Sequence, residues 1–273
     1  MKVIPALKIT KVVADLCVQA NLFLRRDVLA ALNKAYRLEK NLRAKRLLAA
    51  VIENARIAKK EKLAICQDTG MPIVFLEIGQ DVRITGSFKD AVNRGVELGY
   101  KKASLRNSII REPLARGKAG FSPAVIHTDI VKGNKIKITV LPKGFGCENK
   151  SQVKMFNPTA KLEEIKKFIV DAVKAAGPDA CPPYVVGIGI GGTADYACLL
   201  AKKALIRRIG ARNSKLEKDL LKEINILNIG PMGLGGKATV LAVNIETYPT
   251  HIAGLPVAVN ISCHALRSAS AIF

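Results

Sequence analysis

The sequence predicts an α/β protein in which a helical N-terminal segment precedes mixed sheets with surrounding helices. Three observations favour this class. Residues 1–62 carry apolar side chains at helical spacing, the later apolar runs have the length of strands, and the core is built from aliphatic residues, because aromatics make up 5% of the chain and Trp is absent. We expect one domain over residues 1–273, with 1–62 as its helical segment. A boundary within residues 143–160 is the alternative.

The elements are expected in the following order. Three helices span residues 8–23, 26–38 and 40–60, and the runs MPIVFLEIG and DVRITG then form short strands before a helix at 89–103. AVIHTDI and KIKITVLP are joined by Lys132-Gly133-Asn134, which favours a tight hairpin turn and antiparallel pairing. A helix at 160–176, the strand YVVGIGI, helices at 193–208 and 214–224, and the strands TVLAVNIE and PVAVNIS complete the chain. No internal repeat is visible.

The chain is strongly basic, with 44 Lys and Arg residues against 22 acidic residues. The basic residues lie at helical intervals without interleaved aromatics or a known binding module, so we expect no nucleic-acid partner. A solvated face, an acidic partner subunit, or a field that attracts dianionic substrates are the remaining interpretations. Apolar runs fall well short of the roughly 20 residues of a membrane helix, and no signal peptide is recognisable, so the cytoplasm is the expected compartment.

The spacing of the six cysteines excludes a zinc ribbon and a ferredoxin signature, because no two of them form a C-x-x-C pair. A disulfide framework is not expected in a cytoplasmic protein of this length. Any metal site must therefore be assembled by the fold from distant positions. Cys17 and Cys198 fall on helical apolar stripes, which indicates core packing.

Three other cysteines stand in loops suited to chemistry. Cys66 begins the segment CQDTG, where Gly70 permits a tight turn, and an incidental thiol in a turn is the alternative. Cys181 precedes two prolines that stiffen the entry to a strand, although a buried free thiol is common there. Cys263 follows the last strand. Taken alone, His251 reads as a structural histidine and Arg106 as a surface residue, although a guanidinium binds carboxylates well.

Two glycine-rich segments imitate nucleotide motifs. GIGIGG matches the dinucleotide pattern, but no acidic residue follows at the required distance for a ribose. We interpret it as a glycine turn whose backbone N–H groups, with Thr193 capping the next helix, face a carboxylate or an inorganic cofactor. GPMGLGGK fails as a phosphate loop because Ala238 stands where Ser or Thr is needed.

Taken together, CQDTG, SLRNS, KGFGCENKS, ACPP, GIGIGGTADYA, IGPMGLGGKAT, PTHIAGLPVAVN and SCHALR resemble, in order, the N-terminal region of class I fumarate hydratases and the alpha subunit of the related L-tartrate dehydratase. The resemblance covers about residues 60 to 267. It implies a fold like that N-terminal region and a hydro-lyase that interconverts fumarate and L-malate, with tartrate dehydration as the alternative. The motifs do not separate these substrates.

The resemblance also implies a 4Fe-4S cluster held by Cys66, Cys181 and Cys263, with one open iron that acts as a Lewis acid. Family members contact substrate through residues that correspond to Gln67, Arg106, Gly144 and Gly146 here. Asp68 and His251 correspond to a pair that shares the proton of the hydroxyl. This chain departs from the family loop at Phe145 and at Cys147, and an alternative is that Cys147 replaces or supplements a cluster ligand.

One-chain members continue into a second domain, whereas this sequence ends at Phe273. The resemblance therefore implies a separate β subunit, a heterotetramer with two copies of each subunit, and no activity for this chain alone. An electron-transfer cluster protein and a basic nucleic-acid-binding protein are the rival classes.

Overall fold

The computed structural model describes residues 1–273, and its contacts divide the chain into two compact units. The first contains Met1–Arg25, Ala55–Phe145 and Arg267–Phe273, and the second contains Arg26–Asn54 and Gly146–Leu266. The division after Phe145 falls inside residues 143–160, the segment considered above as a boundary. The single domain stays a prediction.

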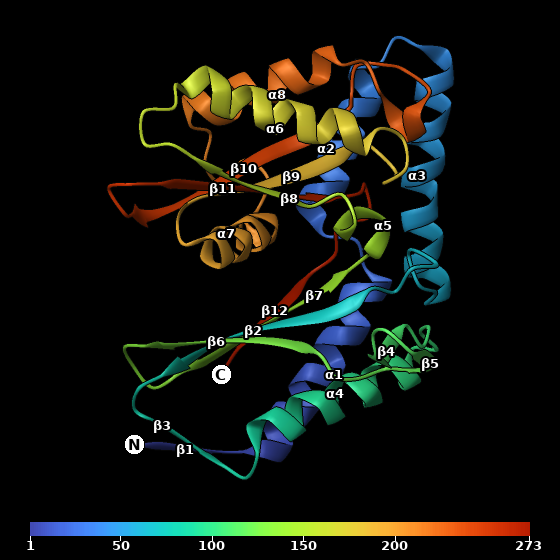
Figure 1. Cartoon of the computed structure of the whole chain (residues 1–273). Coiled ribbons are helices and arrows are strands. Elements are labelled where there is room, and N and C mark those ends of the chain that lie inside the picture. The colour runs from blue at the N-terminus through green and yellow to red at the C-terminus, as the bar shows by residue number, and fades with distance from the viewer. The chain divides into compact units, whose positions relative to one another are not determined.

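The first unit is built on one four-stranded sheet. Its elements are β1 (Lys2–Pro5), α1 (Ala6–Leu22), β2 (Met71–Gly79), β3 (Val82–Thr85), α4 (Phe88–Lys102), β4 (Ile109–Glu112), β5 (Arg116–Gly120), β6 (Val125–Val131), β7 (Ile136–Lys143) and β12 (Ala269–Ile272). The main sheet has the order β12-β7-β2-β6, and β1 with β3 and β4 with β5 form small separate sheets. The helices α1 and α4 pack together on one face of the main sheet (Figure 1).

The sequence explains why β2 is central and why α4 begins where it does. Almost every residue of β2 is buried, as expected for a strand that is apolar on both faces. Ser87 caps α4 by accepting a hydrogen bond from the Asp90 N–H at 3.3 Å. Val92, Val96 and Tyr100 then recur at helical spacing and enter the core with β2 and α1.

The predicted hairpin between β6 and β7 is wrong, because β2 lies between these two strands. β6 pairs with β2 in parallel and β7 pairs with β2 in antiparallel orientation. The connection crosses the end of β2 at Gly79, whose N–H donates to the Lys135 carbonyl at 2.8 Å. A Cβ at Gly79 would lie 2.2 Å from the Gly133 carbonyl oxygen, so a side chain there would block the crossing. The turn-like composition of the connection therefore reflects a crossing rather than a hairpin.

The second unit contains a similar sheet between helices. Its elements are α2 (Arg26–Leu38), β8 (Gln152–Phe156), α6 (Leu162–Ala176), β9 (Tyr184–Gly192), α7 (Ala194–Ile206), α8 (Lys215–Ile226), the 3₁₀ turn η1 (Pro231–Gly233), β10 (Val240–Thr250) and β11 (Leu255–Ser262). The strand order is β10-β9-β11-β8. The helices α6 and α8 cover one face and α7 covers the other (Figure 1). Two further helices, α3 (Leu42–Glu61) and the short α5 (Phe145–Glu148), each contain residues of both units.

The two sheets share one topology. In each, a central strand lies between a parallel and an antiparallel neighbour that follow each other in sequence, and a fourth strand pairs with the antiparallel one. β2, β6, β7 and β12 correspond in this way to β9, β10, β11 and β8. Helices separate the central strand from its parallel neighbour in both units. The backbone therefore contains a repeat that the sequence does not reveal.

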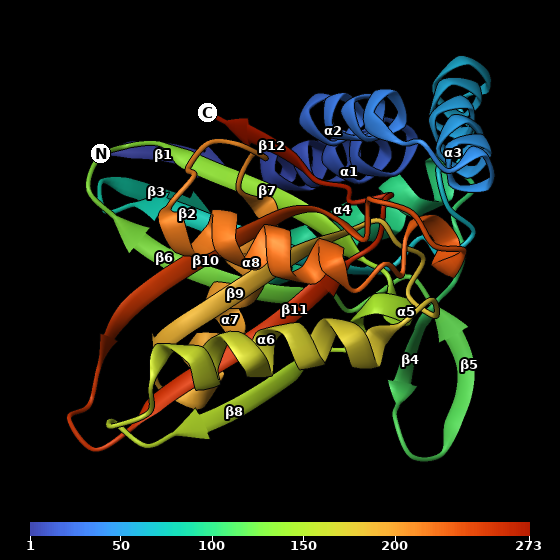
Figure 2. The same ribbon diagram turned by 90° about the horizontal axis from the view of Figure 1, so that it is seen from above.

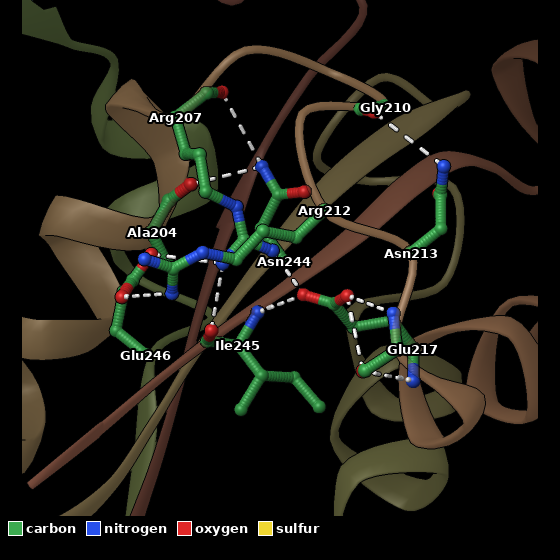
Figure 3. A network of polar contacts seen from close by, with 10 residues as sticks. Ala204, Arg207, Gly210, Arg212, Asn213, Glu217, Asn244, Ile245 and Glu246 are labelled. Atoms are coloured by element: carbon green, nitrogen blue, oxygen red, sulfur yellow. Dashed lines mark hydrogen bonds and ion pairs between the residues drawn. The ribbon is translucent and has the colours of Figure 1, made fainter.

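A buried ion-pair network joins α8 to β10 in the second unit (Figure 3). The Arg207 guanidinium pairs with Glu217 and donates to the Glu246 carboxylate and the Ile245 carbonyl, both at 2.8 Å. Glu217 also accepts from the Ile245 N–H at 2.9 Å. Burial favours the neutral form of Glu217, but these hydrogen bonds and the Arg207 charge outweigh it and lower its pKa. The network explains how a carboxylate and a guanidinium are accommodated in the interior.

The α/β class is confirmed, and each predicted helix and strand is present with bounds that differ by a few residues. The sequence missed β1, β4, β5, β8 and β12, none of which is longer than five residues. Runs this short carry too little periodicity to predict a strand. Their pairing partners, rather than their sequences, place them in sheets.

Candidate functional site

The segment CQDTG forms a loop that leads into β2, and the first unit holds it by its carbonyl groups. Arg267 Nη2 donates to the Asp68 carbonyl at 2.7 Å. The Tyr100 hydroxyl donates to the Thr69 carbonyl at 2.9 Å and to the Gly70 carbonyl at 3.2 Å. Both side chains are buried, with 3% and 1% of their surface exposed. Three consecutive carbonyls are therefore anchored on the core side, which fixes the path of the loop.

The Asp68 carboxylate is oriented by two backbone N–H groups. One oxygen accepts from Gly70 at 2.9 Å, and the other accepts from Phe145 at 2.8 Å. Each carboxylate oxygen keeps a further lone pair for another partner. The predicted residue Gly144 lies beside this group, because a Cβ at Gly144 would stand 3.1 Å from Asp68 Oδ2. The structure thus brings the CQDTG loop and the Gly144 loop together.

Gly70 makes this arrangement possible. Its φ is +75°, and a Cβ there would lie 2.8 Å from the Lys143 nitrogen. Only glycine combines a positive φ with so close an approach to a neighbouring strand. The turn predicted at Gly70 is confirmed, and it places Asp68 against the end of β7.

Arg106 is tied to the same loop through its backbone. Its N–H donates to Thr69 Oγ1 at 3.2 Å, and Thr69 Oγ1 donates to the Arg106 carbonyl at 3.4 Å. The side chains of Arg106 and Gln67 are exposed, and those of Cys66 and Asp68 are half-buried. Five of the predicted site residues, including Gly144, thus lie in one unit near one loop. Sequence reasoning missed Tyr100 and Arg267, and only the SCHALR motif carried a signal for the latter.

The second unit contains the other two predicted ligands. The His264 N–H donates to the Cys181 carbonyl at 3.4 Å, and His264 Nδ1 lies 3.1 Å from the same oxygen. Cys263, the residue before His264, is thereby held next to the Cys181 segment although 82 positions separate the two in sequence. Both thiols are half-buried. Cys181 adopts φ +56°, a region that residues other than glycine rarely occupy and that often marks a functional position.

Cys147 also contacts the Cys181 segment. Its buried thiol lies 3.3 Å from the Ala180 carbonyl, within hydrogen-bond distance for sulfur. A Cβ at Gly146 would lie 3.9 Å from the Asp179 carbonyl oxygen, so this part of the KGFGCENKS loop packs on the same segment. Cys147 as a supplementary ligand of the cluster therefore remains an alternative prediction.

The donor chemistry fits an iron-sulfur cluster, since thiolates are its usual ligands and two predicted ones stand on adjacent backbone. No group of three or more His, Cys, Asp or Glu side chains suited to a metal ion is assembled within either unit. Cys66 belongs to the first unit, whereas Cys181 and Cys263 belong to the second. The set of three ligands therefore stays a prediction.

Two further thiols, at Cys17 and Cys198, have raised pKa values. Burial raises the pKa of the Cys17 thiol to about 12, and Cys17 is fully buried as predicted. Burial also raises the pKa of Cys198, which packs on a small cluster of alanines. Thiols kept protonated in this way are poor metal ligands, because the thiolate is the binding form.

His251 lies in the connection between β10 and β11 and is exposed. Its Nδ1 accepts a hydrogen bond from the Ala253 N–H, at 3.2 Å between the two nitrogens. The ring proton of the neutral imidazole is then on Nε2, which is directed away from this contact. His251 and Asp68 belong to different units, and their pairing stays a prediction.

Gly187 and Gly189 of the glycine segment serve packing, whereas Gly191 and Gly192 at the end of β9 have positive φ values of +95° and +69°. The ligand of this segment stays a prediction. A Cβ at Gly187 or Gly189 would lie 2.2 or 2.0 Å from a carbonyl oxygen of α7. These glycines thus let the helix approach the strand closely. Thr193 occupies the N-cap position of α7 as expected, although its side chain makes no capping hydrogen bond. The GPMGLGGK segment contacts the cysteine region, because the Met232 N–H donates to the Pro182 carbonyl at 2.9 Å.

Comparison with known proteins places these features in context. The sequence model of the fumarate hydratase (Fumerase) family matches residues 10–272. A protein of Methanocaldococcus jannaschii, provisionally named L(+)-tartrate dehydratase subunit alpha, is 42% identical over 276 residues, covering 96% of this chain and 96% of its own length. The L(+)-tartrate dehydratase subunit alpha of Escherichia coli is 30% identical and that of Shigella sonnei 29% identical, each over 269 residues, covering 95% of this chain and 89% of the relative. No helix of the chain is long and apolar enough to cross a membrane.

Proposed function

The chain belongs to the fumarate hydratase (Fumerase) family. From this family we propose that it is the α subunit of a two-subunit hydro-lyase, and that its reaction is the reversible hydration of fumarate to L-malate. The observation that carries the proposal is the anchored CQDTG loop. There Asp68, two residues after the half-buried Cys66, is oriented by two backbone N–H groups. A rigid carboxylate beside a thiol is what a hydro-lyase with a thiolate-bound cofactor needs.

The cofactor of the proposed enzyme is a 4Fe-4S cluster held by Cys66, Cys181 and Cys263. With three thiolate ligands, one iron keeps an open position and supplies a Lewis acid for the substrate oxygens. The half-buried state of the three thiols and the positive φ of Cys181 support this assignment.

The chain's own residues bind the dicarboxylate and move the proton. Arg106, whose backbone is fixed by Thr69, presents an exposed guanidinium that clamps one substrate carboxylate. Gln67 and the backbone at Gly144 and Gly146 complete the contacts to substrate.

Asp68 and His251 carry the proton of the hydroxyl that enters or leaves. The Asp68 carboxylate keeps free lone pairs, and His251 Nε2 carries a proton because Nδ1 accepts from Ala253. The two groups together hold and deliver one proton.

A separate β subunit completes the enzyme, and two copies of each subunit form the assembly. The names of the relatives, which contain the words subunit alpha, support this proposal. The net charge of +22 suits an acidic partner chain and a dianionic substrate.

Tartrate dehydration to oxaloacetate is the second candidate, because the relatives compared above carry that name. Tartrate differs from malate by one hydroxyl. A pocket built for that hydroxyl leaves a buried polar group unpaired when malate binds, and so discriminates between the two substrates. The family description favours fumarate, and a direct assay separates the two.

The test is anaerobic co-expression with the candidate β subunit, followed by separate assays for fumarate formed from malate and for oxaloacetate formed from tartrate. We expect activity on malate that is lost in Cys181→Ser. Cys198→Ser is the matched control, because Cys198 is a half-buried thiol outside the proposed ligand set.

Visible absorbance and iron content of the anaerobically purified chain provide a cluster signal besides activity. This cluster signal is expected in wild type and in Cys198→Ser but not in Cys181→Ser. Activity confined to tartrate would transfer the assignment to the second candidate. An unchanged cluster signal in Cys181→Ser would refute the ligand assignment.

A further inference from the structure

The hairpin formed by β4 and β5 is buried at its base, at Ile109, and exposed along its outer part. Its two strands form a separate two-stranded sheet (Figure 2). Residues 111–118 are all exposed, and Leu114 at the tip is 91% exposed. A two-stranded hairpin without further packing is at best marginally stable in water. A hydrophobic side chain at such a tip gains stability only when another surface covers it.

The hairpin is also basic. Arg111, Arg116 and Lys118 project from it, and Glu112 is its one acidic residue. The Glu112 carboxylate already accepts the Leu114 N–H at 3.1 Å and so stabilises the turn. Three positive charges around one exposed leucine are complementary to a partner surface that has an apolar pocket surrounded by acidic residues.

A groove of about 710 Å³ separates the base of this hairpin from α4. Ile109, Ile110 and Arg111 line it from the hairpin, and Arg94 lines it from α4. Two polar groups of the α4 wall are already satisfied, because Glu97 accepts from Ser122 and Asn93 accepts from Ala124. The groove therefore offers two isoleucine side chains, and the guanidinium groups of Arg94 and Arg111 are balanced there by the carboxylates of Asp90 and Glu97, so it suits an apolar segment.

The hairpin and the groove adjoin the candidate site. β4 begins three residues after Arg106, and Met71, which lines the groove, follows Gly70 of the CQDTG loop. A chain that occupied the groove would therefore contact a residue next in sequence to this loop. A second copy of this chain fits poorly, since it carries the same basic hairpin and the same net charge of +22.

We infer that the β4–β5 hairpin is a docking arm for the β subunit. The β subunit receives Leu114 in an apolar pocket surrounded by acidic residues, and a segment of the β subunit lies in the groove. This inference rests on the proposed two-subunit enzyme. It adds the surface by which the second subunit is held beside Arg106. Leucine and arginine anchors of this kind, once desolvated, commonly dominate the binding energy of an interface.

The test measures binding rather than activity. The purified chain is titrated by calorimetry with the separately expressed and purified β subunit, in the absence of substrate, for wild type, Leu114→Asp and the double variant Arg111→Glu/Arg116→Glu. We expect each variant to weaken binding at least about tenfold, which corresponds to about 1.4 kcal/mol. The double variant should also show a weaker dependence of affinity on salt.

Two matched variants control for nonspecific effects. Ile226→Asp changes another exposed aliphatic residue, 79% exposed, and Lys132→Glu/Lys135→Glu reverses two exposed charges elsewhere. Both are expected to bind as wild type does, and circular dichroism should show that all variants fold. Wild-type affinity in both arm variants would overturn the docking arm and leave the proposed function intact. If wild type does not bind the β subunit, the docking arm and the two-subunit proposal are overturned together. If the chain associates with itself and Leu114→Asp abolishes that self-association, the arm binds a second copy of this chain instead.

Discussion

Removing one hydroxyl group tests whether the core side of the CQDTG loop is anchored as described. In Tyr100→Phe the ring is retained, including its edge contact with Phe121 at 6.2 Å between centroids, and only the donor to the Thr69 and Gly70 carbonyls is lost. Burial raises the pKa of the Tyr100 hydroxyl well above its ordinary value, so the group stays protonated and remains a donor.

The magnitude follows from the burial of these groups. A buried acceptor left without a donor costs about 1–3 kcal/mol. One hydroxyl serves both carbonyls, so we expect the free energy of unfolding to fall by about 2 kcal/mol in Tyr100→Phe. For a chain of this size that corresponds to a decrease in Tm of about 3–4 °C.

Thermal and urea unfolding, followed by circular dichroism, measure this change. Tyr248→Phe is the matched control, because Tyr248 is 54% exposed. The control should unfold within about 0.5 kcal/mol of wild type. If Tyr100→Phe were as stable as the control, the hydroxyl would not anchor the loop and the description of the site would need revision.

Three further predictions address the site and the two sheets. Gly70→Ala forces an alanine into φ +75° and places its Cβ 2.8 Å from the Lys143 nitrogen. We therefore expect the hydratase activity of the assembled enzyme to be lost, and a wild-type kcat in this variant would contradict the geometry. Gly189→Ala places a Cβ 2.0 Å from the Ala197 carbonyl oxygen, so the free energy of unfolding measured in urea should fall by about 3 kcal/mol or more, and a neutral result would refute the close packing of α7. The pKa of Glu217 is lower in the folded chain than its ordinary value of 4.5, so its contribution to stability is complete above that pH and is lost as the pH falls through the folded pKa. The advantage of wild type over Glu217→Gln in urea should be constant from about pH 8 to 5.5 and shrink below about 4.5; an advantage that persists at lower pH would contradict this.

The candidate site was predictable in part. Linear motifs identified the CQDTG loop and Arg106, and the structure brings them together with Gly144 through Thr69 and the Asp68 carboxylate. Such motifs are informative because a loop that presents several functional groups needs a particular local sequence. The groups that hold the loop from behind were not predictable, since a buried tyrosine on a helix looks like any other core residue.

Spacing between cysteines carried less information. Cys181 and Cys263 lie far apart in sequence, and only the fold places His264 on the Cys181 carbonyl. A periodic pattern reports which face of an element is buried but not which element covers it. The contact between these two segments therefore had to come from the structure.

The sequence by itself determined the α/β class, the helices and longer strands, and the glycine at the turn before β2, because these depend on local periodicity and on backbone conformation. The tertiary structure alone decided the strand order, including the insertion of β2 between β6 and β7 and the matching arrangement around β9. It also decided that Gly79 and Gly189 serve close crossings rather than turns or ligands. The physical reason is that strand pairing and close packing join residues remote in sequence, and the hydrogen-bonding capacity of a strand is the same for every partner.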